Sequence, residues 1–295
     1  MSRTTLVLGG GQLAFDLQRA WKRHHPEDAL VALGHADVDV ADLASVRAAL
    51  GAQEPGLVVN TAAYNRVDEA EGALDRALAV NATGAGNVAV ACREVDAVLV
   101  HVSTDYVFSG RVRRPHVEGD PVDPVNVYGA SKAAGEMLVR CLLPRHFIVR
   151  SSGLYGVAGS SGKGGNFVET MLGLARSGRD IRVVDDQVLT PTPTAALAEQ
   201  IALLTTTDAY DTYHATCQGE CSWYDFAAEI FRRAGLHPPL QRQSSAQLGA
   251  KARRPAYSVL ENAALRRLGL DVLPDWRDGL ADYLALRGAA SVPGG

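Results

Sequence analysis

The chain has 295 residues, of which 47% are hydrophobic and 21% are charged, and its formal net charge at pH 7 is -4. This size and composition are typical of a globular enzyme with one large domain or two closely joined domains. Basic residues are not in excess, which argues against a protein that binds nucleic acid. No apolar run approaches the roughly 20 residues of a membrane span, and no cleavable leader precedes the first apolar stretch. We therefore predict a cytoplasmic protein without membrane contact.

The four cysteines are too few for a disulfide framework in a chain of this length. Cys217 and Cys221 lie close together, but no second pair of Cys or His residues stands nearby with the spacing of zinc ligands. We predict reduced thiols and no metal site.

The first predicted strand, Leu6–Leu8, runs into a glycine-rich turn and then into a helix. This order is typical of a dinucleotide site, because glycines allow the backbone to approach a pyrophosphate and the helix N-terminus offers free N–H groups. The turn departs from the usual fingerprint, since Gly9 and Gly11 are only two positions apart and Ala14 stands where a third glycine is expected. Alone, the turn fits either a dinucleotide site or a purely structural role.

The second predicted strand, Ala29–Leu33, is followed by Gly34 and His35 rather than by an acidic residue. A carboxylate at this place would bind the adenosine ribose of NAD and repel a 2′-phosphate. Its absence favours NADPH, with NADH left open.

Later segments continue the alternation of strands and helices. Strands are predicted at 57–59, 98–103, 147–150, 181–184 and 210–215. Helices are predicted after the cap Asp42, at 67–80, 84–94, 127–141, 166–176, 195–204, 260–268 and 276–286, and from Ser222 to Ala234. Thr194 is the predicted cap of the helix at 195–204. The residues 111–124, 156–165 and 241–257 are predicted loops, the first two over the site.

These elements predict an α/β fold: a doubly wound parallel sheet of the Rossmann type with a smaller α/β substrate-binding domain. Residues 1–150, with a return helix near 192–205, would form the dinucleotide-binding domain. Residues 151–191 and 206–290 would form the substrate-binding domain. The ligand crevice is expected at the carboxyl ends of the strands.

Tyr128 and Lys132 lie on the predicted helix 127–141 with three residues between them. That spacing places both side chains on one face, about one turn apart. A neighbouring ammonium favours the phenolate and would lower the tyrosine pKa from its free value of about 10. A phenol tuned in this way can give a proton to a carbonyl oxygen. The same spacing also occurs on ordinary surface helices.

Hydroxyl and basic side chains flank this helix in the sequence. Ser103 and Thr104 end a central strand, where they would hold a substrate carbonyl oxygen or cap the strand. Lys251, Arg253 and Arg254 lie close together and would meet phosphates or remain solvated.

Several motifs together resemble one family, the dTDP-4-dehydrorhamnose reductases among the extended short-chain dehydrogenase/reductases. The likeness covers nearly the whole chain. It rests on residues 60–64 (NTAAY), 67–71 (VDEAE), 103–110 (STDYVFSG), 127–132 (VYGASK), 165–168 (GNFV), 186–187 (DQ), 191–194 (PTPT) and 254–260 (RPAYSVL).

The resemblance implies a role for each matching residue. Tyr128 would be the proton donor, Lys132 its partner and a ligand of the cofactor ribose, Thr104 a ligand of the substrate carbonyl, and Asp105 a residue that orients the sugar. The cofactor would be held by Gly9, Gly10, Gly11, Gln12, Leu13, Asp39, Val40, Ala62, Ala63, Tyr64, Ser103, Tyr128 and Lys132. The substrate would be held by Thr104, Asp105, Phe108, Asn166 and Arg254.

The resemblance also implies the reaction, in which NADPH, or NADH, reduces the C4 ketone of a nucleotide-linked 4-keto-6-deoxy sugar. The product would be dTDP-L-rhamnose or a related deoxysugar nucleotide. Tyr106 stands where related dehydratases have a Glu, which removes the acid needed to eliminate water. Gly153 stands where many members have a Trp, so a different sugar nucleotide is also considered, as is a homodimer.

Two other classes remain open. One is a non-catalytic regulatory subunit like that of methionine adenosyltransferase, which the short glycine turn favours and the Thr104, Tyr128 and Lys132 set disfavours. The other is an epimerase that retains its cofactor.

Overall fold

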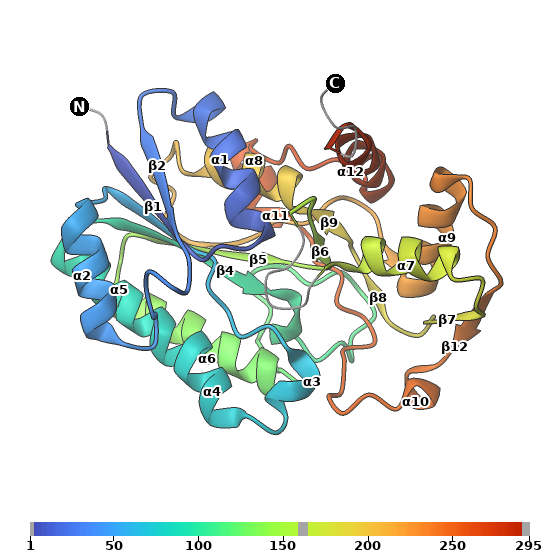
Figure 1. The fold of residues 1–295 in the computed structure, drawn as a ribbon. Helices are drawn as coiled ribbons and strands as arrows, with labels where there is room; N and C mark the ends of the chain where they lie inside the picture. Colours follow the sequence, from blue (N-terminus) through green and yellow to red (C-terminus); the bar gives the residue numbers. More distant parts are fainter. Residues whose placement is uncertain (1–2, 159–164, 291–295) are drawn as a thin grey trace.

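The computed structural model describes residues 3–158 and 165–290, and its central feature is a six-stranded sheet (Figure 1). The strand order is β10-β5-β4-β3-β1-β2, and all the pairs are parallel. The strands are β1 (Thr4–Leu8), β2 (Ala29–Leu33), β3 (Leu57–Asn60), β4 (Val98–Thr104), β5 (His146–Ser151) and β10 (Thr212–His214). The order reverses between β1 and β3, which is where a doubly wound sheet opens a crevice for a ligand. The predicted fold class is confirmed.

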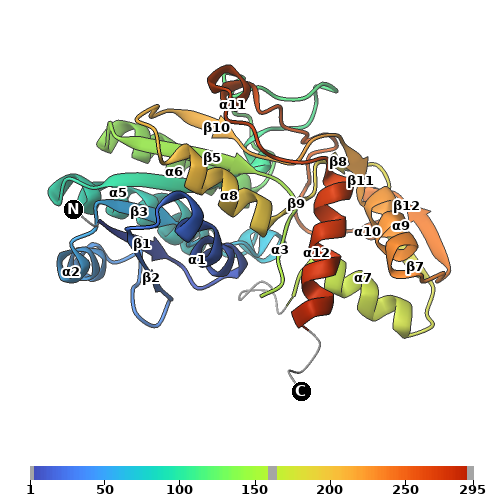
Figure 2. The same cartoon turned by 90° about the horizontal axis from the view of Figure 1, so that it is seen from above.

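Helices cover both faces of this sheet (Figure 2). Successive strand residues point to opposite faces, so Val7 packs beneath one set of helices while Leu6 and Leu8 pack beneath the other. The first set is α1 (Gln12–His24), α8 (Thr194–Leu204) and α11 (Ala263–Leu268). The second is α2 (Leu43–Gln53), α5 (Gly84–Glu94) and α6 (Val127–Leu142). The strands are therefore apolar on both faces, as expected for a buried parallel sheet.

The segment predicted as one helix at 67–80 is divided. It forms α3 (Val67–Ala70) and α4 (Leu74–Leu78), followed by a π-helical turn at Ala79–Thr83 that leads into α5. The Asn81 side chain accepts a hydrogen bond from the Tyr64 N–H at 2.8 Å and donates to the Ser131 hydroxyl at 2.9 Å. These bonds fix the widened turn against α6, close to the predicted site, which is where such turns are common.

A second layer of elements packs around its own apolar core beside the carboxyl ends of the sheet. Its core includes Phe226, Trp276 and Leu280. The helices are α7 (Phe167–Arg176), α9 (Trp223–Ala234), α10 (Ser245–Leu248) and α12 (Trp276–Ala290). The strand pairs are β7 (Ile181–Val184) with β12 (Leu240–Gln243), β8 (Val188–Leu189) with β11 (Cys221–Ser222), and β6 (Leu154–Tyr155) with β9 (Thr192–Pro193).

The division into two domains stays a proposal, with one change to its boundary. The return helix near 192–205 corresponds to α8, which packs on α1. The sequence predicts residues 212–214 in the substrate-binding domain. In the structure they form β10, which pairs with Ile148–Arg150 and extends the main sheet. We therefore propose that the larger unit also includes β10.

Two of the three predicted helix caps, Asp42 and Ser222, are confirmed, and the third, Thr194, is wrong. Asp42 caps α2 by accepting from the Ala44 N–H, and Ser222 caps α9 in a reciprocal capping box with Asp225, as predicted. Thr194 is not a cap: α8 begins at Thr194, and its hydroxyl donates instead to the buried Asp16 carboxylate. The predicted loop at 241–257 contains the end of β12 and all of α10.

Candidate functional site

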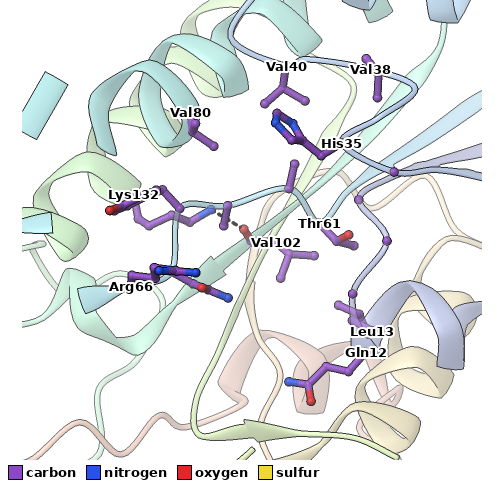
Figure 3. A pocket seen from close by; sticks show the side chains of 18 of the residues that line it. Gln12, Leu13, His35, Val38, Val40, Thr61, Arg66, Val80, Val102 and Lys132 are labelled. Atoms are coloured by element: carbon purple, nitrogen blue, oxygen red, sulfur yellow. Dashed lines mark hydrogen bonds between the residues drawn. The ribbon is translucent and has the colours of Figure 1, made fainter. Parts of the chain in front are cut away.

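A cavity of about 750 Å³, the first cavity, lies at the carboxyl ends of β1, β3 and β4 (Figure 3). Every residue predicted to hold a cofactor lines it, so the shortened glycine turn does not close the space. These residues are Gly9, Gly10, Gly11, Gln12, Leu13, Asp39, Val40, Ala62, Ala63, Tyr64, Ser103, Tyr128 and Lys132.

The glycine turn brings backbone close to this cavity. Gly9 has φ +121°, and a Cβ there would lie 2.4 Å from the Thr61 Oγ1, so any other residue would be strained. Gly11 precedes α1, whose first turn has neither a side-chain cap nor an acidic residue. The first N–H groups of α1 and the positive end of its dipole therefore face the cavity, which suits an anion such as a pyrophosphate.

We expect Gly9→Ala to destabilise the protein by about 1–3 kcal/mol, because the new side chain would be strained and would displace Thr61. Urea unfolding would measure the loss, and NADPH titration would show weaker binding. Gly10→Ala is the matched control. The nearest atom to its Cβ is the Gly34 Cα at 3.6 Å, and Gly10 has no positive φ, so its stability should be close to that of the unmodified protein. Equal stability of the two variants would contradict this account of Gly9.

The end of β2 forms the wall of the first cavity through Gly34 and His35. Two nearby carboxylates have local partners: Asp37 accepts from the Gly34 N–H at 2.8 Å, and Asp39 accepts from the Ala41 N–H at 3.0 Å. His35 faces the cavity between Val40 and Thr61 (Figure 3). The residues directly after β2 are thus not acidic, as expected of a site that admits a 2′-phosphate, although the Asp37 carboxylate lies against the Gly34 N–H.

Tyr128 is held at the start of α6 by its neighbours. The Asn126 side chain caps α6 by accepting from the Gly129 N–H at 2.7 Å and donates to the Arg253 carbonyl at 2.8 Å. A Cβ on Gly129 would lie 2.1 Å from the Tyr106 carbonyl oxygen. The absence of a side chain at 129 thus lets α6 pack directly against the 3-10 turn Asp105–Val107, which follows β4 and carries Tyr106.

Lys132 lies one turn further along α6 and is 2% exposed. Its ammonium donates to the Val102 carbonyl at 2.7 Å (Figure 3), and Nζ lies 3.4 Å from His101 Nε2. Burial lowers the pKa of Lys132 to about 8, against a smaller opposing effect of Glu136. The ammonium is therefore anchored on the sheet at the floor of the cavity.

The predicted acidification of Tyr128 is wrong for this structure. Burial raises the pKa of Tyr128 to about 12, and the Asp105 carboxylate raises it further, while a hydrogen bond with the Thr104 hydroxyl lowers it. The effect of burial thus outweighs that of the Lys132 ammonium, which donates to the Val102 carbonyl. The phenol is consequently neutral at pH 7, which is the form that can donate a proton.

Asp105 is 3% exposed and lies beneath Thr104. Its carboxylate accepts hydrogen bonds from the hydroxyls of Thr104 at 3.0 Å, Ser152 at 2.9 Å and Ser258 at 2.6 Å. Burial raises the pKa of Asp105 to about 6 despite these donors. Thr104 and Asp105 line neither cavity, so their predicted contacts with a substrate stay predictions, and Asp105 fixes the Thr104 hydroxyl.

Between α6 and the sheet lies a buried ion pair that the sequence did not indicate. Arg150 donates to Glu136 through Nε at 2.9 Å and through Nη2 at 2.7 Å, and the Ser103 hydroxyl donates to the same carboxylate at 2.6 Å. These residues come from β5, α6 and β4. The pair therefore fixes the helix that carries Tyr128 to the sheet.

Glu136→Gln should destabilise the protein by about 3–5 kcal/mol, because it leaves the buried Arg150 charge unpaired. Thermal or urea unfolding would measure the loss. Glu94→Gln provides the comparison, since Glu94 pairs with Arg47 on the surface, and its stability should be nearly unchanged. A Glu136→Gln variant as stable as Glu94→Gln would refute the importance of the buried pair.

A second cavity, of about 550 Å³, adjoins the first. Arg66 and Glu69 line both cavities. Tyr106, in the wall of the second, makes an edge contact with Tyr128, in the wall of the first, with ring centroids 5.9 Å apart. The other lining residues are Val67, Asp68, Phe167, Met171, Arg182, Val183, Val184, Gln187, Trp223, Gln243, Leu248 and Arg254.

Of the predicted substrate residues, Arg254 alone lines the second cavity. Phe108 is 1% exposed and its ring stacks on His116 at 4.2 Å, so it is a core residue. Asn166 caps α7 and donates to the Gly156 carbonyl at 2.9 Å. The structure therefore does not bring Phe108 and Asn166 to the site, because both are used in packing or capping.

Gly153 also lies outside both cavities. Its φ is +56°, and a Cβ would lie 2.8 Å from Leu189 Cδ1, so a side chain there would be strained and would displace the end of Leu189. The aromatic surface of the second cavity comes instead from Tyr106, Phe167 and Trp223.

Two loops, at 111–124 and 156–165, were predicted to lie over the site, and the structure describes only the first of them in full. Residues 111–124 are irregular but line neither cavity, and the buried residues His116 and Leu260 form a bridge. Most of the predicted loop at 156–165 lies outside the described residues.

Three further findings concern membrane spans, metal sites and cysteines in the described part of the chain. Within residues 3–158 and 165–290, no helix is long and apolar enough to cross a bilayer. Over the same ranges, no group of His, Cys, Asp and Glu side chains is placed to hold a metal ion. Cys92, Cys141, Cys217 and Cys221 are all free thiols.

A dinucleotide-type cavity, with a tyrosine and a lysine on one helix at its edge, defines a member of the short-chain dehydrogenase/reductase class. Residues 3–287 match the family described as "RmlD substrate binding domain". The chain belongs to this family, that of the dTDP-4-dehydrorhamnose reductases.

Individual relatives agree with this assignment. The chain is 40% identical over 290 residues to the spore coat polysaccharide biosynthesis protein SpsK of Bacillus subtilis, covering 98% of this chain and 99% of that protein. It is 42% identical over 273 residues to a dTDP-4-dehydrorhamnose reductase of Streptomyces griseus, covering 90% and 88%. The crystal structure of the Bacillus anthracis dTDP-4-dehydrorhamnose reductase in complex with NADP is 38% identical, with a TM-score of 0.92, covering 97% of this chain and 100% of that chain.

Proposed function

We propose that this protein uses NADPH to reduce the C4 ketone of a nucleotide-linked 4-keto-6-deoxy sugar, forming dTDP-L-rhamnose or a related deoxysugar nucleotide. The observation that carries the proposal is the place of Tyr128, whose side chain lies in the wall of the first cavity and contacts Tyr106 in the wall of the second. A proton donor between two adjoining cavities fits a reaction between two bound molecules. The relatives named for this activity support the sugar-nucleotide substrate.

The first cavity fits a nicotinamide dinucleotide. The open N-terminus of α1 suits its pyrophosphate, and the absence of an acidic residue directly after β2 suits a 2′-phosphate. NADPH, when bound there, would supply the hydride. The residues at its edge, Tyr128 and Lys132, would then act on the oxygen that becomes negatively charged.

In the proposed reaction, a hydride adds to C4 and the electron pair of the C=O bond moves to the oxygen. Tyr128 then gives its phenolic proton to that oxygen. The raised pKa of Tyr128 keeps the donor protonated beforehand. The hydrogen bond with Thr104 and the positive charge of Lys132 nearby on α6 would stabilise the phenolate that remains.

The test is the loss of NADPH absorbance when the purified protein is mixed with a freshly generated dTDP-4-keto-6-deoxy sugar. Loss of absorbance with formation of a 4-hydroxy sugar nucleotide is expected. Binding of NADPH without turnover would instead support a regulatory protein. Isolation of the protein with tightly bound NAD and no net oxidation of NADPH would support an epimerase.

We also propose that the protein is a cytoplasmic homodimer. The surface considered for the dimer is that of the neighbouring helices α4 and α6, where Leu74 is 51% exposed and Met137 is 62% exposed. Light scattering on the purified protein would give its mass, and a monomer at micromolar concentration would contradict the dimer. Cell fractionation would test the location.

A further inference from the structure

The second cavity is lined by three arginines, and their charges are not equally compensated. Arg254 donates to Asp68 through Nη1 at 3.2 Å and through Nη2 at 2.6 Å. Arg66 donates to Glu69 at 3.0 Å. Arg182 lines the same cavity, and within residues 3–158 and 165–290 no carboxylate forms an ion pair with it. The lining therefore carries a positive charge that its own acidic residues leave uncompensated.

Arg182 lies on the exposed face of β7 and is one of the residues that line the second cavity. Ile181 and Val183 are buried in the apolar core under α7 and α9, whereas Arg182 is exposed on the opposite face of the strand. Its backbone is held by parallel pairing with Gln241, and the Gln243 side chain donates to its carbonyl at 3.3 Å. A fixed backbone with an exposed guanidinium is a suitable arrangement for binding an anion from the solvent side.

The residues that line the second cavity indicate how a sugar nucleotide would lie in it. The ketone must lie at the end near Tyr106, because that ring contacts Tyr128. The aromatic side chains Phe167 and Trp223, with ring centroids 4.6 Å apart, also line the cavity and suit stacking with a base. The diphosphate connects these two parts of the ligand, so it must also lie in this cavity.

We propose that Arg182 binds the diphosphate of the sugar nucleotide and is a specificity-determining residue for it. This inference rests on the proposed function and adds the group that recognises the two phosphates. A guanidinium can bind phosphate oxygens with two parallel hydrogen bonds. Arg254 and Arg66 already direct such bonds to Asp68 and Glu69, whereas Arg182 is available.

The experiment measures dissociation constants for thymidine, dTMP and dTDP by isothermal titration calorimetry on the NADP-loaded full chain. In Arg182→Ala, dTDP should bind about 10–100-fold more weakly, dTMP less so, and thymidine within about twofold of the unmodified protein. Arg182→Lys should recover part of the dTDP affinity, because it keeps the charge but not the fork. Arg179→Ala is the matched control, since Arg179 is exposed just before the same strand and lines neither cavity.

Three results would overturn the proposal. These are unchanged dTDP affinity in Arg182→Ala, an equal loss for thymidine and dTDP, or the same loss in Arg179→Ala. If the unmodified protein binds dTDP and reduces the keto sugar while Arg182→Ala does so equally well, only the role of Arg182 fails. If the unmodified protein neither binds dTDP nor oxidises NADPH, the proposed function fails as well.

Discussion

Tyr128→Phe should reduce kcat by about 10²–10⁴-fold, the usual contribution of a positioned general acid, while NADPH affinity changes by less than about threefold. The substitution removes only the hydroxyl that is hydrogen-bonded with Thr104, and the ring keeps its edge contact with Tyr106. Stopped-flow oxidation of NADPH with the keto sugar nucleotide would measure turnover, and fluorescence titration would measure cofactor binding.

Tyr106→Phe provides a comparison for this experiment. The Tyr106 hydroxyl is hydrogen-bonded with Arg254. Removing this hydroxyl should mainly weaken substrate binding and raise KM, rather than reduce kcat by orders of magnitude. A Tyr128→Phe enzyme with full turnover would refute the assigned role. Equal kcat losses in both variants would indicate that the proton does not come from Tyr128 alone.

Lys132→Met should reduce both kcat and NADPH affinity, each by at least tenfold, and yet make the protein more stable. The ammonium is the positive charge at the floor of the first cavity, so its removal takes away a contact to the cofactor and the charge that stabilises a phenolate. Unaltered NADPH affinity in Lys132→Met would contradict this account.

The stability gain follows from the lowered pKa of Lys132, about 8 in the folded protein against an ordinary 10.5. Between these pH values the unfolded chain binds more protons, so the free energy of unfolding rises with pH there. Below pH 8 the buried charge costs roughly 3 kcal/mol. Methionine removes this cost but leaves the Val102 carbonyl without its donor, at about 1 kcal/mol. Urea unfolding at pH 7 should therefore show a net gain of roughly 2 kcal/mol.

The same pKa predicts a pH dependence for cofactor binding. As the pH rises through about 8, Lys132 loses its proton and the unmodified protein should bind NADPH more weakly. The methionine variant should show no change of affinity near pH 8. A similar pH profile in both proteins would show that another group is responsible.

Periodicity and strand-end chemistry were sufficient to predict the sheet and the first cavity. Gly9, Ala62 and Lys132 are far apart in the chain, but each follows a strand or lies on a helix that the fold brings to the same edge of the sheet. Motif likeness was less reliable for Phe108 and Asn166. Both residues belong to matching motifs, yet one is in the core and the other caps a helix.

Side-chain direction and long-range pairing could not be predicted from the chain. The spacing of Tyr128 and Lys132 gave their common face, but not the bond from Lys132 to Val102 that turns the ammonium toward the sheet. Glu136 and Arg150 meet only after α6 docks on β5, and neither residue stands in a motif. Arg182 lies in an ordinary predicted strand, and it became notable only because it lines the second cavity and has no carboxylate partner among the described residues.

Arg66 and Glu69 stand in the wall between the two cavities and belong to both. A molecule that displaces either side chain on one side reshapes the space on the other. Affinity for the dinucleotide and affinity for the second ligand are then linked, and by thermodynamic reciprocity each changes the other by the same factor. A ligand in one cavity that moved this ion pair would therefore change the affinity of the other cavity for its own ligand.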